Sequence, residues 1–303
     1  MITIFGAGAV GIALAVQLSR AGRPVTLVRL RRHTGSRMML RHGDDSAGVP
    51  CCFLEEWKPL GNELLVITAK AFANETLAAA IARRGATGPV CLLQNGINIE
   101  RPFLKRGFGS LCRGVLYVTG EAVEEGVSTL KAVKPSFLGR ICGEAPERYV
   151  AQLSTPAIPF VACDRIEEEI WTKGIVNAVF NSICTLLEVD NGIFARCADT
   201  LALAREVVAE AVHVAHRLGI PVNETAILET VLQISRSSRH LISTLQDLRQ
   251  GRPTEIEFLN LAIHELAQQL SPPVVVPRTH LLGELVRLKS YHQGSGAMPA
   301  SQE

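Results

Sequence analysis

Residues 1–11, MITIFGAGAVG, decide the fold of the first part of the chain. A short run of β-forming residues is followed directly by a Gly-x-Gly-x-x-Gly pattern, and then by apolar residues at helical spacing. In such a strand–turn–helix, the first glycine permits the tight turn, the second lets a pyrophosphate approach the backbone, and the third lets helix and strand pack closely. The start of the helix also favours phosphate through its free N–H groups and its dipole. The stretch predicts a dinucleotide-binding loop made of Gly6, Ala7, Gly8, Ala9, Val10 and Gly11; the alternative is a glycine turn used only for packing.

Strand-like and helix-like segments alternate after this loop. Apolar runs at residues 24–28, 63–68 and 90–93 are typical of strands, and residues 71–84 are typical of a helix. This alternation predicts a parallel sheet with helices on both faces. Between residues 114 and 141, short strand-like runs separated by turn signals indicate antiparallel strands that close the first domain.

The strand signals stop near residue 164. Segments 166–187, 199–218, 224–235, 241–250 and 253–270 have helical periodicity, and Pro221, Gly251 and Pro272 punctuate them. The expected fold class is therefore α/β, with an N-terminal Rossmann dinucleotide-binding domain over residues 1–164 and an all-helical C-terminal domain over residues 165–292. Residues 293–303, rich in small and polar side chains, are expected to be a flexible tail.

Composition narrows the class of function. A chain of 303 residues fits two domains at about 150 residues each. The 31 basic and 29 acidic side chains give a net charge of +2, which argues against a protein built to grip nucleic acid. The eight cysteines show no C-x-x-C spacing, and no histidine stands at zinc-site spacing, so no metal site is expected. We find neither a signal peptide nor a membrane span of about 20 apolar residues, and expect a cytoplasmic protein with free thiols.

The end of the second predicted strand bears on cofactor choice. The stretch reads VTLVRLRRH and lacks the Asp or Glu that binds the ribose 2′-OH in NAD sites. Arg29, Arg31 and Arg32 stand there instead, and a guanidinium suits a 2′-phosphate. NADPH/NADP+ is therefore expected rather than NAD, although at least one of these arginines fits a solvated basic loop.

A polar stripe interrupts an otherwise apolar helix. In IWTKGIVNAVFNSICTLL, Lys173, Asn177 and Asn181 stand at i, i+4 and i+8, within about 80° of one another around the helix. Buried amides and ammonium groups are costly unless they are paired. An ion-pair partner and satisfied amides would explain the three residues singly, but together they predict a face that lines a cleft. A lysine there suits carbonyl reduction, because it can donate a proton to the oxygen that gains charge as hydride arrives.

Five separated motifs resemble those of the ketopantoate reductase family (2-dehydropantoate 2-reductases). They are GAGAVG at residue 6, ITAKAF around Lys70, LLQNG at Asn95, the WTK…N…N helix followed by Asp190-Asn191-Gly192, and STLQDLRQGRPTEIEFLN around Glu255. The resemblance covers residues 1–289. It implies an oxidoreductase that uses NADPH to reduce 2-dehydropantoate to (R)-pantoate in pantothenate and coenzyme A biosynthesis.

The same resemblance implies roles for individual residues. Lys173 matches the catalytic lysine, the general acid, and Glu255 matches the acidic residue that orients the lysine and the substrate. Asn95 matches the asparagine beside the nicotinamide and the reacting groups, and Lys70 a lysine at the cofactor edge. The residues matched to substrate contacts, the last of them to the carboxylate, are Asn177, Asn181, Asn191 and Ser243.

Departures from the family pattern keep alternatives open. The usual 2′-phosphate arginine counts onto Leu30, with Arg29 and Arg31 on either side, and the usual glycine after Asn260 is Leu261. A reductase of another 2-oxo acid is one alternative, and a non-catalytic NADP(H)-sensing protein is another. A homodimer is compatible with the apolar surface of segment 202–218, which a monomer core explains equally well.

Overall fold

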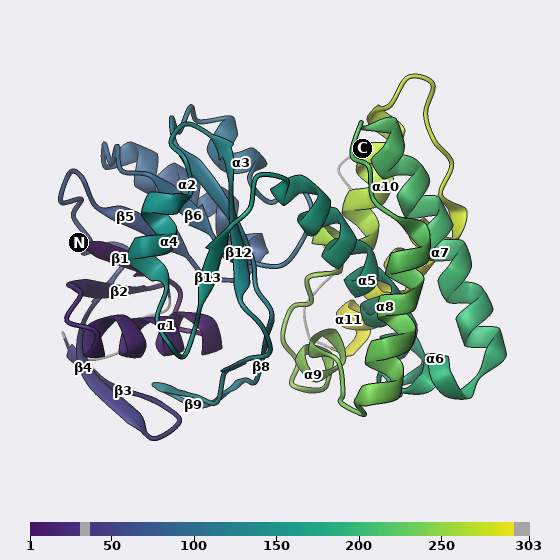
Figure 1. Cartoon of the computed structure of the whole chain (residues 1–303), viewed down its shortest axis with the longest axis horizontal. Helices are drawn as coiled ribbons and strands as arrows, with labels where there is room; N and C mark the ends of the chain where they lie inside the picture. The colour runs from purple at the N-terminus through teal and green to yellow at the C-terminus, as the bar shows by residue number, and fades with distance from the viewer. Residues whose placement is uncertain (31–36, 294–303) are drawn as a thin grey trace. The chain divides into compact units, whose positions relative to one another are not determined.

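The computed structural model describes residues 1–30 and 37–293, and the chain divides into two compact units (Figure 1). The first unit holds Met1–Asn95 and Ile99–Ile166, and the second holds Gly96–Asn98 and the chain from Glu167 onward. The tripeptide Gly96–Asn98 thus packs with the second unit although its sequence neighbours belong to the first. The domain division expected at residue 164 did not assign this tripeptide to the second unit.

A parallel sheet forms the centre of the first unit. Its core strands lie side by side in the order β4-β2-β1-β5-β6-β7, each parallel to its neighbour. This is the 3-2-1-4-5-6 strand order of the Rossmann fold, so the predicted fold class is confirmed. The strands are β1 (Ile2–Phe5), β2 (Val25–Arg29), β4 (Asp45–Phe53), β5 (Leu64–Ile67), β6 (Val90–Leu92) and β7 (Leu111–Val115).

Further strands extend the sheet at both ends. Beyond β7 lie β12 (Ser136–Cys142), which is antiparallel to it, and β13 (Phe160–Ala162). Beyond β4 lie β3 (Arg37–His42), β10 (Val127–Ser128) and β9 (Ala122–Glu124), and a separate pair joins β8 (Val118–Thr119) to β11 (Lys131–Ala132). The antiparallel strands predicted between residues 114 and 141 are confirmed. The β3–β4 hairpin was not predicted, because Gly48 and Pro50 interrupt its apolar pattern.

Helices of the first unit follow their strands closely. They are α1 (Ala9–Arg20), the 3-10 turn η1 (Ala71–Ala73), α2 (Asn74–Arg83), α3 (Arg101–Leu104) and α4 (Glu147–Leu153). The helix α1 is buried from Gly11 to Leu18 and joins the core cluster of the sheet. It ends where Gly22 takes a φ of 71°, the left-handed conformation expected just past a helix end.

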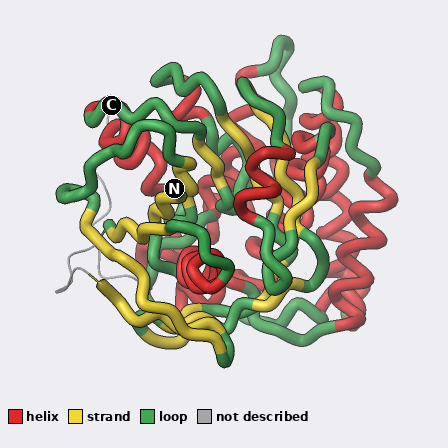
Figure 2. The backbone as a smooth tube through the Cα atoms, turned by 60° about the vertical axis from the view of Figure 1, so that its left-hand side comes forward, coloured by secondary structure: helices red, strands yellow, loops and turns green. Residues whose placement is uncertain are grey.

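The described residues of the second unit form helices and connecting loops (Figure 2, helices in red). The elements are α5 (Ile166–Leu187), α6 (Ile193–Arg196), α7 (Ala198–Arg217), α8 (Glu224–Ser237), α9 (Ser243–Arg249), η2 (Ile256–Phe258), α10 (Asn260–Gln269) and α11 (Pro277–Gln293). The helix predicted over residues 253–270 was too long, since its α-helical part begins only at Asn260. The helix α11 was not predicted, because its leucines lie on both the buried and the exposed side.

The core of the second unit is built on α5 and α7. Buried side chains of α7, including Val207, Val208 and Ala211, belong to this core. Most apolar residues of segment 202–218 are therefore core residues, which favours one of the two explanations left open above, while Ala202, Ala209 and Leu218 are exposed. By length and composition α5 could cross a membrane, but 72% of its apolar window is buried inside the protein.

Candidate functional site

The glycine loop after β1 is shaped by two close backbone approaches and one open position. A methyl group added at Gly6, whose φ is 122°, would lie 2.3 Å from the backbone nitrogen of Ala69. One added at Gly11 would lie 1.9 Å from the carbonyl oxygen of Gly6. One added at Gly8 would meet no described atom within 4 Å. The first and third glycines therefore serve the packing of the loop, while the second leaves the backbone accessible to a ligand.

The helix α1 begins directly in this loop. Gly8 is its N-cap, its first turn holds no acidic residue, and no side chain of the described residues caps it. Its first N–H groups and the positive end of its dipole are therefore suited to an anion. Together with the open position at Gly8, this arrangement fits the pyrophosphate of a dinucleotide.

Two further predicted cofactor residues, Lys70 and Asn95, lie at the same edge of the sheet, close to Thr68, which was not predicted. Thr68, just after β5, donates hydrogen bonds from Oγ1 to the carbonyl oxygens of Gly6 (2.9 Å) and Phe5 (3.2 Å). Lys70 follows two residues later and is exposed. Asn95 is also exposed and follows β6. Because β1, β5 and β6 are parallel, their carboxyl ends share the edge at which nucleotides bind in this fold.

Of the three arginines predicted at the end of β2, the structure describes Arg29. Arg31 and Arg32 lie outside the described residues. Arg29 is the last residue of β2, and its side chain is only 17% exposed. Its guanidinium pairs with Glu125 at 2.5 Å and donates to Sδ of Met38 at 2.9 Å. Glu125 was not singled out from the sequence, since only the turn signal EEG marks its surroundings.

The polar stripe of α5 runs from a half-buried end to a buried one. Lys173 and Asn177 are half-buried, whereas Asn181 is 7% exposed. The Oδ1 atom of Asn181 is buried and has no hydrogen-bond partner among the residues described. Such an acceptor destabilises the fold unless something satisfies it. A hydroxyl group of a ligand on this face of α5 would supply the missing donor.

The tripeptide Gly96–Asn98 touches the neighbours of both predicted catalytic residues. A methyl group added at Gly174, next to Lys173, would lie 2.7 Å from Cγ1 of Ile97. The backbone N–H of Ile97 donates to the carbonyl oxygen of Phe258 at 2.8 Å. Phe258 ends the turn η2, whose N-cap is Glu255. Within the second unit, Ile97 thus joins the turn of α5 that carries Lys173 to the turn that follows Glu255.

Asn191 has a structural setting that the sequence did not reveal. Its Nδ2 donates to Oγ of Ser238 at 2.7 Å, and its Oδ1 accepts from the backbone N–H of His240 at 2.9 Å. Its own N–H donates to the carbonyl oxygen of His240 at 3.1 Å. The Asn191 amide therefore ties the loop after α5 to the segment that leads into α9. Ser243, the first residue of α9, is exposed.

Neighbouring polar groups brace these two loops. The Asp190 carboxylate accepts from the N–H of Gly192 at 2.8 Å and pairs with Arg196 at 3.0 Å. Both contacts lower the pKa of Asp190, and the hydrogen bond from the Gly192 backbone has the larger effect. Asp247 of α9 pairs with Arg252 at 2.8 Å. The second pair ties Arg252, three residues before Glu255, to α9.

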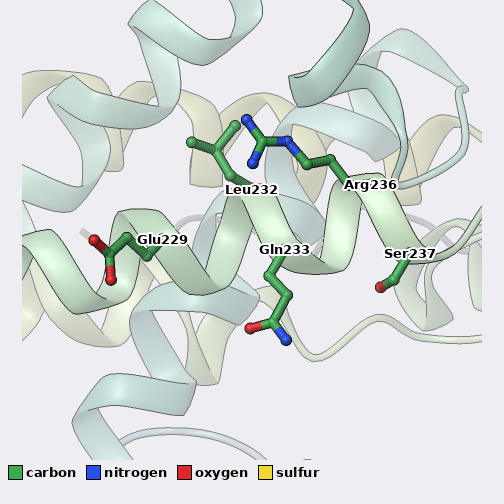
Figure 3. Close-up of a pocket in the computed structure, with 5 residues that line it drawn as sticks. All are labelled: Glu229, Leu232, Gln233, Arg236 and Ser237. Atoms are coloured by element: carbon green, nitrogen blue, oxygen red, sulfur yellow. The ribbon is translucent and has the colours of Figure 1, made fainter.

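A separate surface pocket of about 440 Å³ lies on α8. Its lining residues are Glu229, Leu232, Gln233, Arg236 and Ser237, all from this one helix (Figure 3). Figure 3 shows that these side chains spread around the helix and do not converge on one point. The pocket contains none of the predicted site residues and does not resemble a catalytic site.

Comparison with known proteins agrees with this description. The family model described as ketopantoate reductase PanE/ApbA matches residues 2–141, and its C-terminal counterpart matches residues 165–290. A 2-dehydropantoate 2-reductase of Archaeoglobus fulgidus is 29% identical over 287 residues, covering 92% of this chain and 95% of the relative.

Two solved structures share the fold over nearly the whole length. A D-mandelate dehydrogenase bound to NADH and anilino(oxo)acetate has a TM-score of 0.84 and 22% identity, covering 97% of this chain and 99% of its own. A PanE/ApbA family ketopantoate reductase from Ralstonia eutropha has a TM-score of 0.83 and 24% identity, with the same coverage. The two family models together span most of this chain. The chain therefore belongs to the ketopantoate reductase family and is an oxidoreductase that acts on a 2-oxo acid.

Proposed function

We propose that this protein catalyses the NADPH-dependent reduction of 2-dehydropantoate to (R)-pantoate in the cytoplasm, a step of pantothenate biosynthesis. The observation that carries the proposal is the polar face of α5. A half-buried lysine, Lys173, lies there in line with Asn181, whose buried Oδ1 has no partner among the described residues. A substrate with both a ketone and a hydroxyl group needs a proton donor for the first and a hydrogen-bond acceptor for the second.

The proposed mechanism assigns one task to each side chain. When bound, the nicotinamide supplies the hydride that reaches the ketone carbon. The Lys173 ammonium donates its proton to the ketone oxygen as negative charge develops on it. The Glu255 carboxylate orients the lysine. Asn177 and Asn181 hold the substrate's oxygens.

The remaining predicted residues position the ligands. Ser243, exposed on the first turn of α9, would donate to the substrate carboxylate. The Asn191 amide uses one N–H on Ser238 and one lone pair on the N–H of His240, and its second N–H would donate to the substrate, the contact that the family resemblance predicts. At the sheet edge, the loop Gly6–Gly11 would hold the pyrophosphate, and Lys70 and Asn95 the nicotinamide half. Arg29 and Arg31 would hold the 2′-phosphate.

A second candidate substrate class is supported by one comparison. The D-mandelate dehydrogenase with a TM-score of 0.84 acts on an aromatic 2-hydroxy acid, whose oxidised form is phenylglyoxylate. Leu261 stands where the family usually has glycine, and this departure in the sequence supports a substrate pocket of a different shape.

A homodimer is also proposed, because Leu281, Leu285 and Leu288 leave an exposed apolar stripe along α11. Light scattering at micromolar concentration tests that assembly.

Steady-state kinetics test the proposed function. NADPH oxidation is followed with 2-dehydropantoate, pyruvate, branched 2-oxo acids and phenylglyoxylate, using the wild type, Lys173→Ala and the exposed-site control Lys105→Ala. We expect 2-dehydropantoate to have the highest kcat/KM. Loss of a general acid should lower kcat by about 100-fold or more in Lys173→Ala, while Lys105→Ala keeps wild-type rates. Faster turnover of another oxo acid, or Lys173→Ala activity within tenfold of wild type, would contradict the proposal.

A further inference from the structure

The structure supplies an acidic residue that the end of β2 lacks in the sequence. No Asp or Glu stands in residues 30–43, directly after β2, yet Glu125 reaches this strand end from the turn between β9 and β10 and pairs with Arg29. We propose that Glu125 limits the preference of this protein for NADPH over NADH by competing with the 2′-phosphate for the Arg29 guanidinium. The inference rests on the proposed function only in that a nicotinamide dinucleotide binds at the loop Gly6–Gly11.

The turn that carries Glu125 is fixed beside the dinucleotide loop. Gly126, with a φ of 76°, forms the turn, and its carbonyl oxygen accepts from the N–H of Arg41 at 2.8 Å. Ser128, the second residue of β10, donates from Oγ to the carbonyl oxygen of Ala9 at 2.9 Å. Ala9 is the first residue of α1 and part of the predicted loop. Glu125 is therefore held by two contacts of the residues that follow it, one of them to the loop itself.

The position of the Arg29 guanidinium explains why the pair matters for the cofactor. Arg29 is the last residue of β2, and in this fold the residues at the end of that strand bind the ribose 2′-hydroxyl or 2′-phosphate. Its side chain is 17% exposed, and two of its nitrogens already contact Glu125 and Met38. A 2′-phosphate would have to share this guanidinium with a carboxylate of like charge, whereas a 2′-hydroxyl could donate a hydrogen bond to that carboxylate. The pair therefore reduces the advantage that the Arg29 guanidinium gives to a 2′-phosphate over a 2′-hydroxyl.

A second ion pair on the same hairpin provides a matched control. Glu124, the neighbour of Glu125, pairs with Arg41 at 3.2 Å, and these side chains are 65% and 56% exposed. Glu124→Gln removes the same charge one residue away but leaves the Arg29 guanidinium paired. Any effect of net charge on the hairpin should appear in both variants, and an effect at the ribose only in Glu125→Gln.

Equilibrium binding tests the inference without a substrate. Dissociation constants of NADPH and NADH are measured by nucleotide fluorescence for the wild type, Glu125→Gln, Glu125→Ala and Glu124→Gln, with thermal unfolding to verify the fold. Adenosine 2′,5′-bisphosphate and AMP, measured by calorimetry, isolate the ribose end. We expect both Glu125 variants to raise the ratio of the NADH to the NADPH dissociation constant about tenfold, because a like charge beside the 2′-phosphate is removed. The two fragments should follow the same trend, and Glu124→Gln should stay within twofold of wild type.

The outcomes separate this inference from the proposed function. A ratio that stays within twofold in both Glu125 variants, or that moves equally in Glu124→Gln, overturns the role of Glu125. A wild type that binds neither dinucleotide overturns this inference together with the cofactor part of the proposed function. Tenfold changes in binding with no turnover of any 2-oxo acid uphold Glu125 and overturn the proposed reaction alone.

Discussion

The three glycines of the first loop illustrate how one residue type serves different physical purposes. Gly6 and Gly11 are required by backbone approaches of 2.3 Å and 1.9 Å from an added methyl group, so neither position accepts a side chain without movement of the main chain. Gly8 faces no such neighbour in the described structure. The sequence pattern treats the three alike, but among the described residues Gly8 has no neighbour that requires it to stay small, and it is there that we place the pyrophosphate.

Alanine at these positions should therefore separate stability from binding. We expect Gly11→Ala to lower the free energy of unfolding by about 3 kcal/mol, since overpacking against backbone cannot relax through a rotamer change. Gly8→Ala should lower it by less than about 1 kcal/mol but weaken NADPH binding about tenfold, because the methyl group occupies the space of the pyrophosphate. Urea unfolding and fluorescence titration measure the two effects. Equal stability losses in both variants would refute this assignment.

Single residues also show what sequence patterns reveal and what they do not. The dinucleotide loop could be predicted because its strand, turn and helix lie within a dozen consecutive residues. The polar stripe of α5 could be predicted because helical periodicity places Lys173, Asn177 and Asn181 on one face. Glu125 could not, since its contact with Arg29 depends on how a distant hairpin pairs with β3. The bonds of Asn191 to Ser238 and His240 likewise depend on tertiary folding.

At the scale of elements, the contact of Ile97 with α5 and η2 is the joint nearest the proposed chemistry. Ile97 is 2% exposed, lies in the core of the second unit, and occupies the space left by the missing side chain of Gly174. Its N–H holds the carbonyl oxygen of Phe258. The placement of Lys173 relative to Glu255 is thus expected to depend on how the Ile97 side chain fills the space that Gly174, which has no side chain, leaves open.

A volume exchange tests this joint. Gly174→Ala should lower kcat about tenfold, because the new methyl group meets Ile97 at 2.7 Å and displaces the turn of Lys173. Ile97→Ala alone should cost about 2–4 kcal/mol of stability through the cavity it leaves. The double variant should cost at least about 1 kcal/mol less than the sum and recover part of kcat. Urea unfolding and kinetics at saturating substrate give both quantities. Additive costs with no recovery of kcat would mean that the two side chains do not act on each other.

The elements themselves were predictable to different degrees. The helix α5 matches the predicted residues 166–187, because its apolar run is long and continuous. In contrast, α11 carries Leu282 and Val286 on its buried side and Leu281, Leu285 and Leu288 on its exposed side, so no amphipathic contrast marks it. The start of α10 was missed for a different reason, since the residues before Asn260 form the short turn η2 rather than a helix.

At the scale of the whole molecule, stability should depend on pH through one pair of histidines in the second unit. The rings of His264 on α10 and His280 on α11 stack at 3.7 Å with an interplanar angle of 7°. Burial lowers the pKa of His264, and the neighbouring His280 lowers it further, while Glu284 opposes them. Glu284 itself pairs with Arg287 at 2.5 Å and lies 3.9 Å from Nε2 of His280. A positive charge on His264 would therefore lie against the His280 ring, while the nearby Glu284 carboxylate is already paired with Arg287.

The sign of the effect follows from the direction of that pKa shift. His264 is harder to protonate in the folded protein than in the unfolded chain, whose histidines titrate near pH 6.5. The unfolded state therefore takes up the proton first, and the free energy of unfolding falls as the pH drops below that value. Its buried Nδ1 has no hydrogen-bond partner among the described residues, which adds to the cost of a charged ring.

We therefore expect urea unfolding between pH 8 and pH 5 to show a loss of stability that is smaller in His264→Gln than in the wild type. His213→Gln, an exposed position on α7, serves as the control and should keep the wild-type slope. Carboxylates that titrate in the same range affect all three proteins equally, so the difference between the variants isolates the stack. If His264→Gln and His213→Gln lose stability in parallel with the wild type, the acid sensitivity of the protein lies elsewhere than between α10 and α11.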